Sequence, residues 1–117
     1  MSSQVAEFVR RLVSTSPELI EVYQQHIADQ GEILPHVLMG DITRVVVTAS
    51  TGSTQANWLH DFLQQLEAGL VSGDTDIAEL VGVSFVENLS GQNAALRSLV
   101  PSMGEMLRKE VKSICGV

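Results

Sequence analysis

Apolar residues recur every three or four positions along almost the whole chain, and this helical spacing restricts the possible folds more than any other feature. The first set lies between Val5 and Val13 and puts all of its members on one helical face. Further sets follow, separated by short segments rich in Gly, Ser, Thr and Pro, which are typical of loops. The pattern predicts an all-α fold in which six or seven helices pack as an irregular bundle, in a single compact domain over residues 1–117.

Several helix boundaries are marked by residues that cap helices. Ser16 is a candidate N-cap before Pro17, because proline fits the first helical position. Gly31 can adopt the positive φ that ends a helix. A later helix is expected to be capped by Asp74 or Thr75 and to run to about residue 89.

The segment that follows Pro35 is ambiguous, because residues 45–48 (VVVT) form a β-branched run that would suit a strand. No second convincing strand exists to pair with it, so we expect a helix to continue through this run. Ser53 or Thr54 is expected to cap the next helix. Pro101 is expected to divide a short helix from a final amphipathic one.

The helix expected over residues 75–89 is apolar on more than one face, with Phe85 among its large side chains. We therefore expect it to be the most buried element of the bundle. Gly82 and Ser84 are small and would let a neighbouring helix approach closely. Trp58 is expected to anchor the core, and the alternative is an exposed anchor for a binding partner.

The composition is that of an independently folding domain. The 117 residues are 44% hydrophobic and 18% charged, with a mean hydropathy of +0.18, far from the composition of disordered chains. Neither a leader-like N-terminus nor a long apolar run occurs, so we expect a soluble cytoplasmic protein that makes no membrane contact. The single cysteine, Cys115, cannot form an internal disulfide.

Acidic residues outnumber basic ones by 14 to 7, and the two kinds are unevenly distributed. The net charge of −7 divides into −3 for residues 1–44, −6 for residues 45–96 and +2 for residues 97–117. The acidic residues of the middle segment are candidates for binding a basic protein partner. They are Asp61, Glu67, Asp74, Asp76, Glu79 and Glu87. The alternative is that they form ordinary solvated helix faces and caps. A pI near 4.7 argues against nucleic-acid binding, which draws its affinity from clustered Lys and Arg.

Signals for catalysis, metals or cofactors are weak. The sequence has no glycine-rich phosphate loop, and its serines lack the pattern of a nucleophile elbow. His26, Asp29 and Glu32 recur every three residues, but this spacing is not specific for a metal ion. We therefore predict no catalytic residue, no metal site and no cofactor.

Three stretches resemble a family of short, acidic, helical bacterial domains that has no assigned activity. They are residues 34–44 (LPHVLMGDITR), 63–67 (LQQLE) and 81–89 (VGVSFVENL). Small acidic proteins of this kind are often immunity partners of secreted toxins, so the resemblance suggests protein binding and supplies no catalytic residues. The motif residues expected to shape the fold are Pro35, Gly40 and Asp41 in one helix, and Ser84, Phe85, Glu87 and Asn88 in a later one.

The leading functional hypothesis is a non-enzymatic, immunity-type inhibitor whose acidic helical surface occludes a basic toxin or effector. One alternative is a small-ligand-binding or hydrolytic protein with a site near His36, Asp41 and Glu87. Another is a homodimeric structural or regulatory module. Arg44 is the last basic residue before the acidic segment, and we expect it to pair with Asp41 or Glu87 and to organise the contact between their helices.

Overall fold

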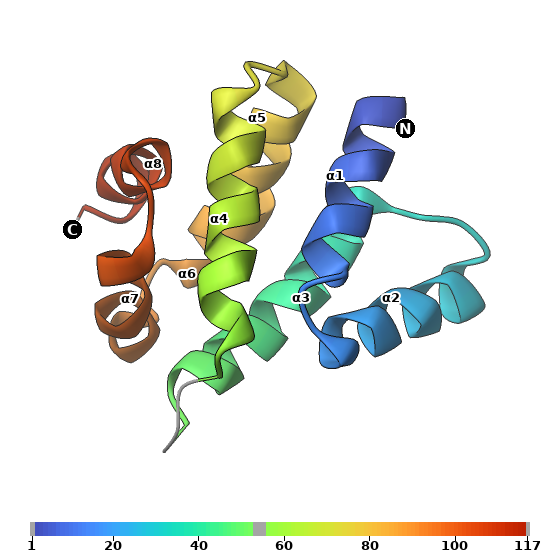
Figure 1. Ribbon diagram of the computed structural model, residues 1–117, viewed down its shortest axis with the longest axis horizontal. Helices are drawn as coiled ribbons and strands as arrows, with labels where there is room; N and C mark the ends of the chain where they lie inside the picture. The colour runs from blue at the N-terminus through green and yellow to red at the C-terminus, as the bar shows by residue number, and fades with distance from the viewer. Residues whose placement is uncertain (1, 53–55, 117) are drawn as a thin grey trace.

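The structure is a computed structural model that describes residues 2–52 and 56–116, and within these ranges it is helical without a strand (Figure 1). Its elements are α1 (Ser3–Val13), α2 (Pro17–Gln30), α3 (Pro35–Ser50), α4 (Trp58–Val71), α5 (Thr75–Val81), the π-helical turn η1 (Gly82–Val86), α6 (Glu87–Leu89), α7 (Asn93–Leu99), the 3-10 turn η2 (Val100–Ser102) and α8 (Glu105–Cys115). Because α5, η1 and α6 follow one another without a break, they act as one helical unit. The predicted all-α bundle of six or seven helices is confirmed.

Most helix boundaries lie where the capping residues in the sequence predicted them. The Ser16 hydroxyl accepts the Glu18 N–H at 3.1 Å, and Gly31 ends α2 with a φ of 74°. Asp74 Oδ1 accepts two backbone N–H groups of the first turn of α5, each at 3.0 Å. These bonds satisfy N–H groups that a helix leaves without an internal partner.

Two further expectations concern α3 and α4. The β-branched run at residues 45–48 is helical, inside α3, as its lack of a partner strand predicted. Helix α4 begins at Trp58, and the caps predicted at Ser53 or Thr54 lie outside the described residues. The Trp58 ring is partly buried against the core, with its centroid 6.1 Å from that of Phe62 in an edge-on arrangement.

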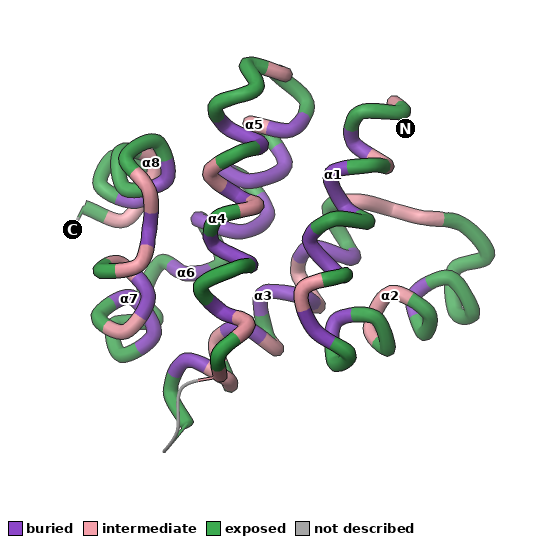
Figure 2. Tube along the Cα trace, viewed as in Figure 1, coloured by how far each residue is buried: buried purple, intermediate pink, exposed green. Residues whose placement is uncertain are grey.

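The unit formed by α5, η1 and α6 is the centre of the bundle, because it packs against α1, α3, α4 and α8. Its buried residues include Leu80, Phe85 and Leu89, and the Phe85 ring lies 5.6 Å from that of Phe62 in α4. In Figure 1, α1 and α2 lie to one side of α4, and α7 and α8 lie to the other. Helix α2 is the most exposed of the long helices and buries only Leu19 and His26 (Figure 2).

The π-helical turn η1 is a feature that the apolar periodicity did not predict. Here the Glu87 N–H bonds to the Gly82 carbonyl, five residues back, where an α-helix would bond four residues back. Gly82 lies under α8, because a Cβ there would be 3.4 Å from Glu110 Oε2 and 3.7 Å from Ile114 Cδ1. The close approach expected at this small residue is therefore present, and the neighbour is α8.

Helix α8 is fixed to α4 by one carboxylate. Glu67 accepts the Met106 N–H at 3.0 Å and the Leu107 N–H at 2.9 Å, so a side chain of α4 caps the N-terminus of α8. Gly104 makes room for it, since a Cβ at this position would come within 2.4 Å of the Glu67 carboxyl carbon. Pro101 lies in η2 and separates α7 from α8, as predicted. Among the described helices, none is both long and apolar enough to cross a membrane.

Candidate functional site

A cavity of about 340 Å³, which we call the acidic cavity, lies between the start of α1, the segment that joins α2 to α3, and α5. Its lining consists of Ser2, Val5, Glu32, Ile33, Leu34, Pro35, His36, Asp76, Glu79 and Leu80. Three of these residues carry a carboxylate and none is a lysine or arginine. Apolar side chains supply much of the remaining wall. The acidic cavity therefore combines negative charge with apolar surface.

One wall of the acidic cavity is the segment between α2 and α3, which is held in place from both ends. Gly31 turns the chain out of α2, and Pro35 begins α3. Between them, the Leu34 N–H donates to Nε2 of His26 at 2.9 Å, and the His26 side chain is only 4% exposed. His26 is therefore a structural residue that fixes the position of Glu32 and its neighbours.

The other wall is the first two turns of α5. Asp74 caps this helix, and Asp76 and Glu79 are three residues apart, so they lie on the same side of it. Both line the acidic cavity, and Asp76 also lies in the first turn, where the helix dipole favours an anion. Leu80 packs below them, with 1% of its surface exposed.

The acidic residues of segment 45–96 are divided among different hollows of the surface. Asp61 lines a separate groove that also contains Arg10 and Arg11. Glu87 is exposed on α6 and does not line the acidic cavity. The six candidates therefore do not line one common cavity, because they belong to different helices.

Two of the six acidic residues predicted to bind a partner have structural roles as helix caps. Glu67 caps α8, and Asp74 caps α5, so their carboxylates are engaged by backbone N–H groups. Of the six candidates, only Asp76 and Glu79 line the acidic cavity together. Glu32 also lines it, although its spacing in the sequence suggested only a metal ligand. The signal that could have found Glu32 is its place between Gly31 and Pro35, which puts it at a sharp turn next to the first motif stretch.

The alternative site at His36, Asp41 and Glu87 is not assembled. His36 lines the acidic cavity, but Asp41 and Glu87 do not. Nδ1 of His36 is hydrogen-bonded to the Ser84 hydroxyl. Ser84 is only 6% exposed and does not line the acidic cavity, so this pair offers no accessible nucleophile there.

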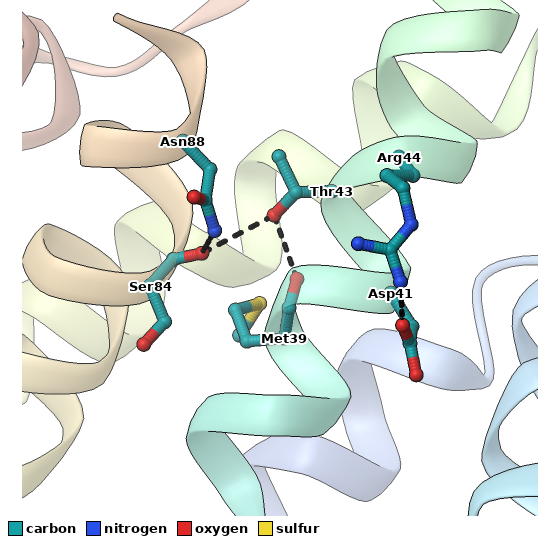
Figure 3. Close-up of polar contacts among 6 residues, drawn as sticks. All are labelled: Met39, Asp41, Thr43, Arg44, Ser84 and Asn88. Atoms are coloured by element: carbon teal, nitrogen blue, oxygen red, sulfur yellow. Dashed lines mark hydrogen bonds and ion pairs between the residues drawn. The ribbon is translucent and has the colours of Figure 1, made fainter.

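The first and third motif stretches meet where α3 packs against η1 and α6 (Figure 3). The Asn88 amide donates to the Ser84 carbonyl at 2.6 Å. The Thr43 hydroxyl donates to the Met39 carbonyl at 2.7 Å and lies 3.4 Å from the Ser84 carbonyl oxygen. The contact between the two helices is therefore organised by neutral polar groups around one carbonyl.

The predicted pair of Arg44 with Asp41 is present, but it does not organise this contact. The Arg44 guanidinium pairs with Asp41, one turn away in the same helix, and the two side chains are 75% and 36% exposed. Figure 3 shows one guanidinium nitrogen bonded to Asp41 and no bond from Arg44 to Ser84 or Asn88. An ion pair this exposed adds little to stability, because water screens it.

Other reactive groups are dispersed. Within residues 2–52 and 56–116, no three His, Cys, Asp or Glu side chains are grouped so that they could hold a metal ion. Cys115 is partly buried, with its Sγ 3.5 Å from the Val86 carbonyl oxygen. Burial raises the pKa of its thiol, and a hydrogen bond with Ser90 acts in the opposite direction. A raised thiol pKa lowers the fraction of nucleophilic thiolate.

Comparisons with known proteins agree with one part of the resemblance, a family without an assigned activity. No curated protein and no solved structure matches the chain. One family model does, and its match includes all three motif stretches and every residue of the acidic cavity except Ser2 and Val5. The chain belongs to the family described as a domain of unknown function (DUF7674), whose model matches residues 9–116.

Proposed function

We propose that this domain is a non-enzymatic protein-binding module, and specifically an immunity-type inhibitor that occludes a basic toxin or effector in the bacterial cytoplasm. The observation that carries the proposal is the acidic cavity, whose lining includes the carboxylates of Glu32, Asp76 and Glu79 and no lysine or arginine. An inhibitor of this kind needs a complementary surface and no catalytic group.

The chemistry of the acidic cavity suits a lysine or arginine side chain of the partner. The aliphatic part of such a side chain can pack on Ile33, Leu34 and Pro35, which are partly exposed, while its charged end meets the carboxylates. A charge pair that is removed from water in this way contributes more than one at the rim of an interface.

The charge of the whole molecule supports the same proposal. With a net charge of −7, the protein attracts a basic partner before contact, which raises the association rate more than it strengthens the final complex. Added salt should therefore slow association steeply.

The test begins with the product of the gene adjacent to that of this protein. The two purified proteins are mixed, and the association rate and Kd are measured in a biosensor at low and high salt. Substitution of Glu32→Gln or Glu79→Gln should each weaken binding about tenfold, which corresponds to about 1.4 kcal/mol. Glu21→Gln and Glu87→Gln remove the same charge outside the acidic cavity and should change Kd less than about twofold.

Two results would contradict the proposal. The first is the absence of binding to the products of the neighbouring genes. The second is an equal loss of affinity in the control variants, which would show that only net charge matters. Light scattering at several concentrations belongs to the same experiment, because a stable homodimer would favour a structural or regulatory module instead.

A further inference from the structure

A second cavity, of about 310 Å³, lies between α3 and the segment that runs from α6 to the start of α7. Seven residues line it: Gly40, Thr43, Arg44, Val47, Thr48, Asn88 and Gln92. None is acidic, although the protein is strongly acidic overall. We propose that this cavity, which we call the α3 cavity, binds a carboxylate, either of a small organic acid or of the C-terminus of a peptide.

Charge is the first argument. Arg44 is the only basic residue between Arg11 and Arg97, and every other charged residue in that interval is acidic. This single cation lies at the α3 cavity, and its guanidinium already contacts one carboxylate, that of Asp41. Asp41 itself is not part of the lining. The Arg44 side chain is 75% exposed and is free to turn toward a ligand, with a fork of N–H donors that fits a carboxylate.

The hydrogen-bond donors of the α3 cavity give the second argument. The Thr43 hydroxyl donates to the Met39 carbonyl, and the Thr48 hydroxyl donates to the Arg44 carbonyl at 3.0 Å, so their hydrogens serve the helix itself. One amide hydrogen of Asn88 goes to the Ser84 carbonyl, which fixes the carboxamide. The second hydrogen of that amide, the Gln92 amide and the guanidinium are the donors that the α3 cavity can offer. A carboxylate, which only accepts hydrogen bonds, matches this set.

Gly40 gives the third argument. It lies inside α3, where glycine is less favourable than alanine, and its φ is not positive. Packing does not require it either, because a Cβ at this position would meet nothing closer than Asn88 Nδ2, at 3.9 Å. A methyl group there would instead project beside the Asn88 amide and reduce the space in the α3 cavity. The glycine therefore keeps this part of the α3 cavity open.

The test is a titration of the full ¹⁵N-labelled chain, followed by amide chemical shifts at constant ionic strength. The probes are succinate, a pentapeptide with a free C-terminal carboxylate, and the same pentapeptide as its C-terminal amide. We expect saturable shifts at Gly40, Arg44, Asn88 and Gln92, with a Kd on the order of 1 mM for an open site of this size. Saturation by succinate alone would identify a small acid, and saturation by the free-acid peptide alone would identify a chain terminus.

Variants distinguish specific binding in the α3 cavity from nonspecific attraction by charge. Arg44→Gln should weaken binding about tenfold, and Asp41→Asn should strengthen it about threefold, because it releases the guanidinium from its internal partner. Gly40→Ala should weaken binding without lowering the Tm. Arg97→Gln and Glu21→Gln make the same charge changes elsewhere and should alter the Kd less than about twofold.

The proposal is overturned if none of the probes produces saturable shifts at these amides. It is also overturned if Arg97→Gln weakens binding as much as Arg44→Gln, or if the amidated peptide binds as well as the free acid. Each of these results is independent of the acidic cavity and leaves the proposed inhibitor function untouched.

Discussion

The joint between α4 and α8 and the joint between α3 and α6 use the same device in different ways. In each, a side chain of one helix reaches main-chain groups of the other: Glu67 accepts two N–H groups of α8, and Thr43 lies 3.4 Å from the Ser84 carbonyl oxygen of η1, which also accepts from Asn88 of its own helical unit. A glycine lies beside each joint. At Gly104 a Cβ would come within 2.4 Å of Glu67, whereas at Gly40 the nearest atom would be 3.9 Å away.

Glycine is therefore present beside these two joints for opposite physical reasons. Gly104 is required by packing, because the Glu67 carboxylate occupies the space of a side chain. Gly40 is not required by packing, so the instability that it introduces into α3 must be tolerated for another reason. Substitutions at the two joints should therefore change the free energy of unfolding in opposite directions.

The largest change in the free energy of unfolding is expected at the joint between α4 and α8. Glu67→Ala removes the acceptor of two N–H groups at the start of α8, so the free energy of unfolding should fall by about 2 kcal/mol. Urea unfolding followed by Trp58 fluorescence measures this change. Glu105→Ala is the matched control, because Glu105 is 80% exposed and only pairs with Lys109, and it should lose less than about 0.5 kcal/mol. Equal losses in the two variants would show that Glu67 is not a cap.

Gly104→Ala should have the next largest effect, a loss of about 1.5 kcal/mol, because the new methyl group displaces the Glu67 carboxylate from α8. The same substitution in the Glu67→Ala background should be nearly neutral, since no carboxylate remains to be displaced. The double-mutant cycle from four urea curves gives the coupling between the two positions. Strict additivity would contradict the close contact.

Gly40→Ala should stabilise the protein, whereas Gly104→Ala should destabilise it. A helix-interior alanine is favoured over glycine by about 0.5–1 kcal/mol, and nothing near Gly40 prevents the new Cβ. The free energy of unfolding should therefore rise, which thermal and urea unfolding both detect. A destabilised Gly40→Ala variant would show that Gly40, like Gly104, is required by packing.

The smallest effect is expected for Arg44→Ala, since the exposed pair with Asp41 contributes no more than about 0.5 kcal/mol. Its urea midpoint should stay close to that of the unmodified protein. A larger loss would show that Arg44 does help to hold α3 against its neighbours.

Local signals in the sequence were sufficient for most of the fold. The positions of α2 and α5 follow from Ser16, Gly31 and Asp74, because caps act on neighbouring residues. The helical state of residues 45–48 required one non-local consideration, the lack of a partner strand. These features depend on periodicity and turn chemistry, which a single sequence displays directly.

The candidate sites were much harder to predict because they depend on contacts between distant segments. Glu67 reaches the N-terminus of α8 across about forty residues, and no local pattern indicates this. Glu32, in the segment between α2 and α3, and Glu79, in α5, line the same cavity, whereas Asp61 and Glu67, closer in sequence to Glu79, lie elsewhere. A charge count along the chain locates acidic segments, but only the packing of the helices determines which carboxylates share a surface.

The π-helical turn sets the relative orientation of two surfaces. One helical unit contributes Glu79 to the acidic cavity and Asn88 to the α3 cavity, and η1 lies between them. A π-helical turn takes five residues where an α-helical turn takes four, so it accommodates one extra residue without rotating the helix that follows. If the same residues formed a regular α-helix, Asn88 would be rotated by about 100° relative to Glu79. The local irregularity of η1 therefore determines which way the residues of the α3 cavity face relative to those of the acidic cavity.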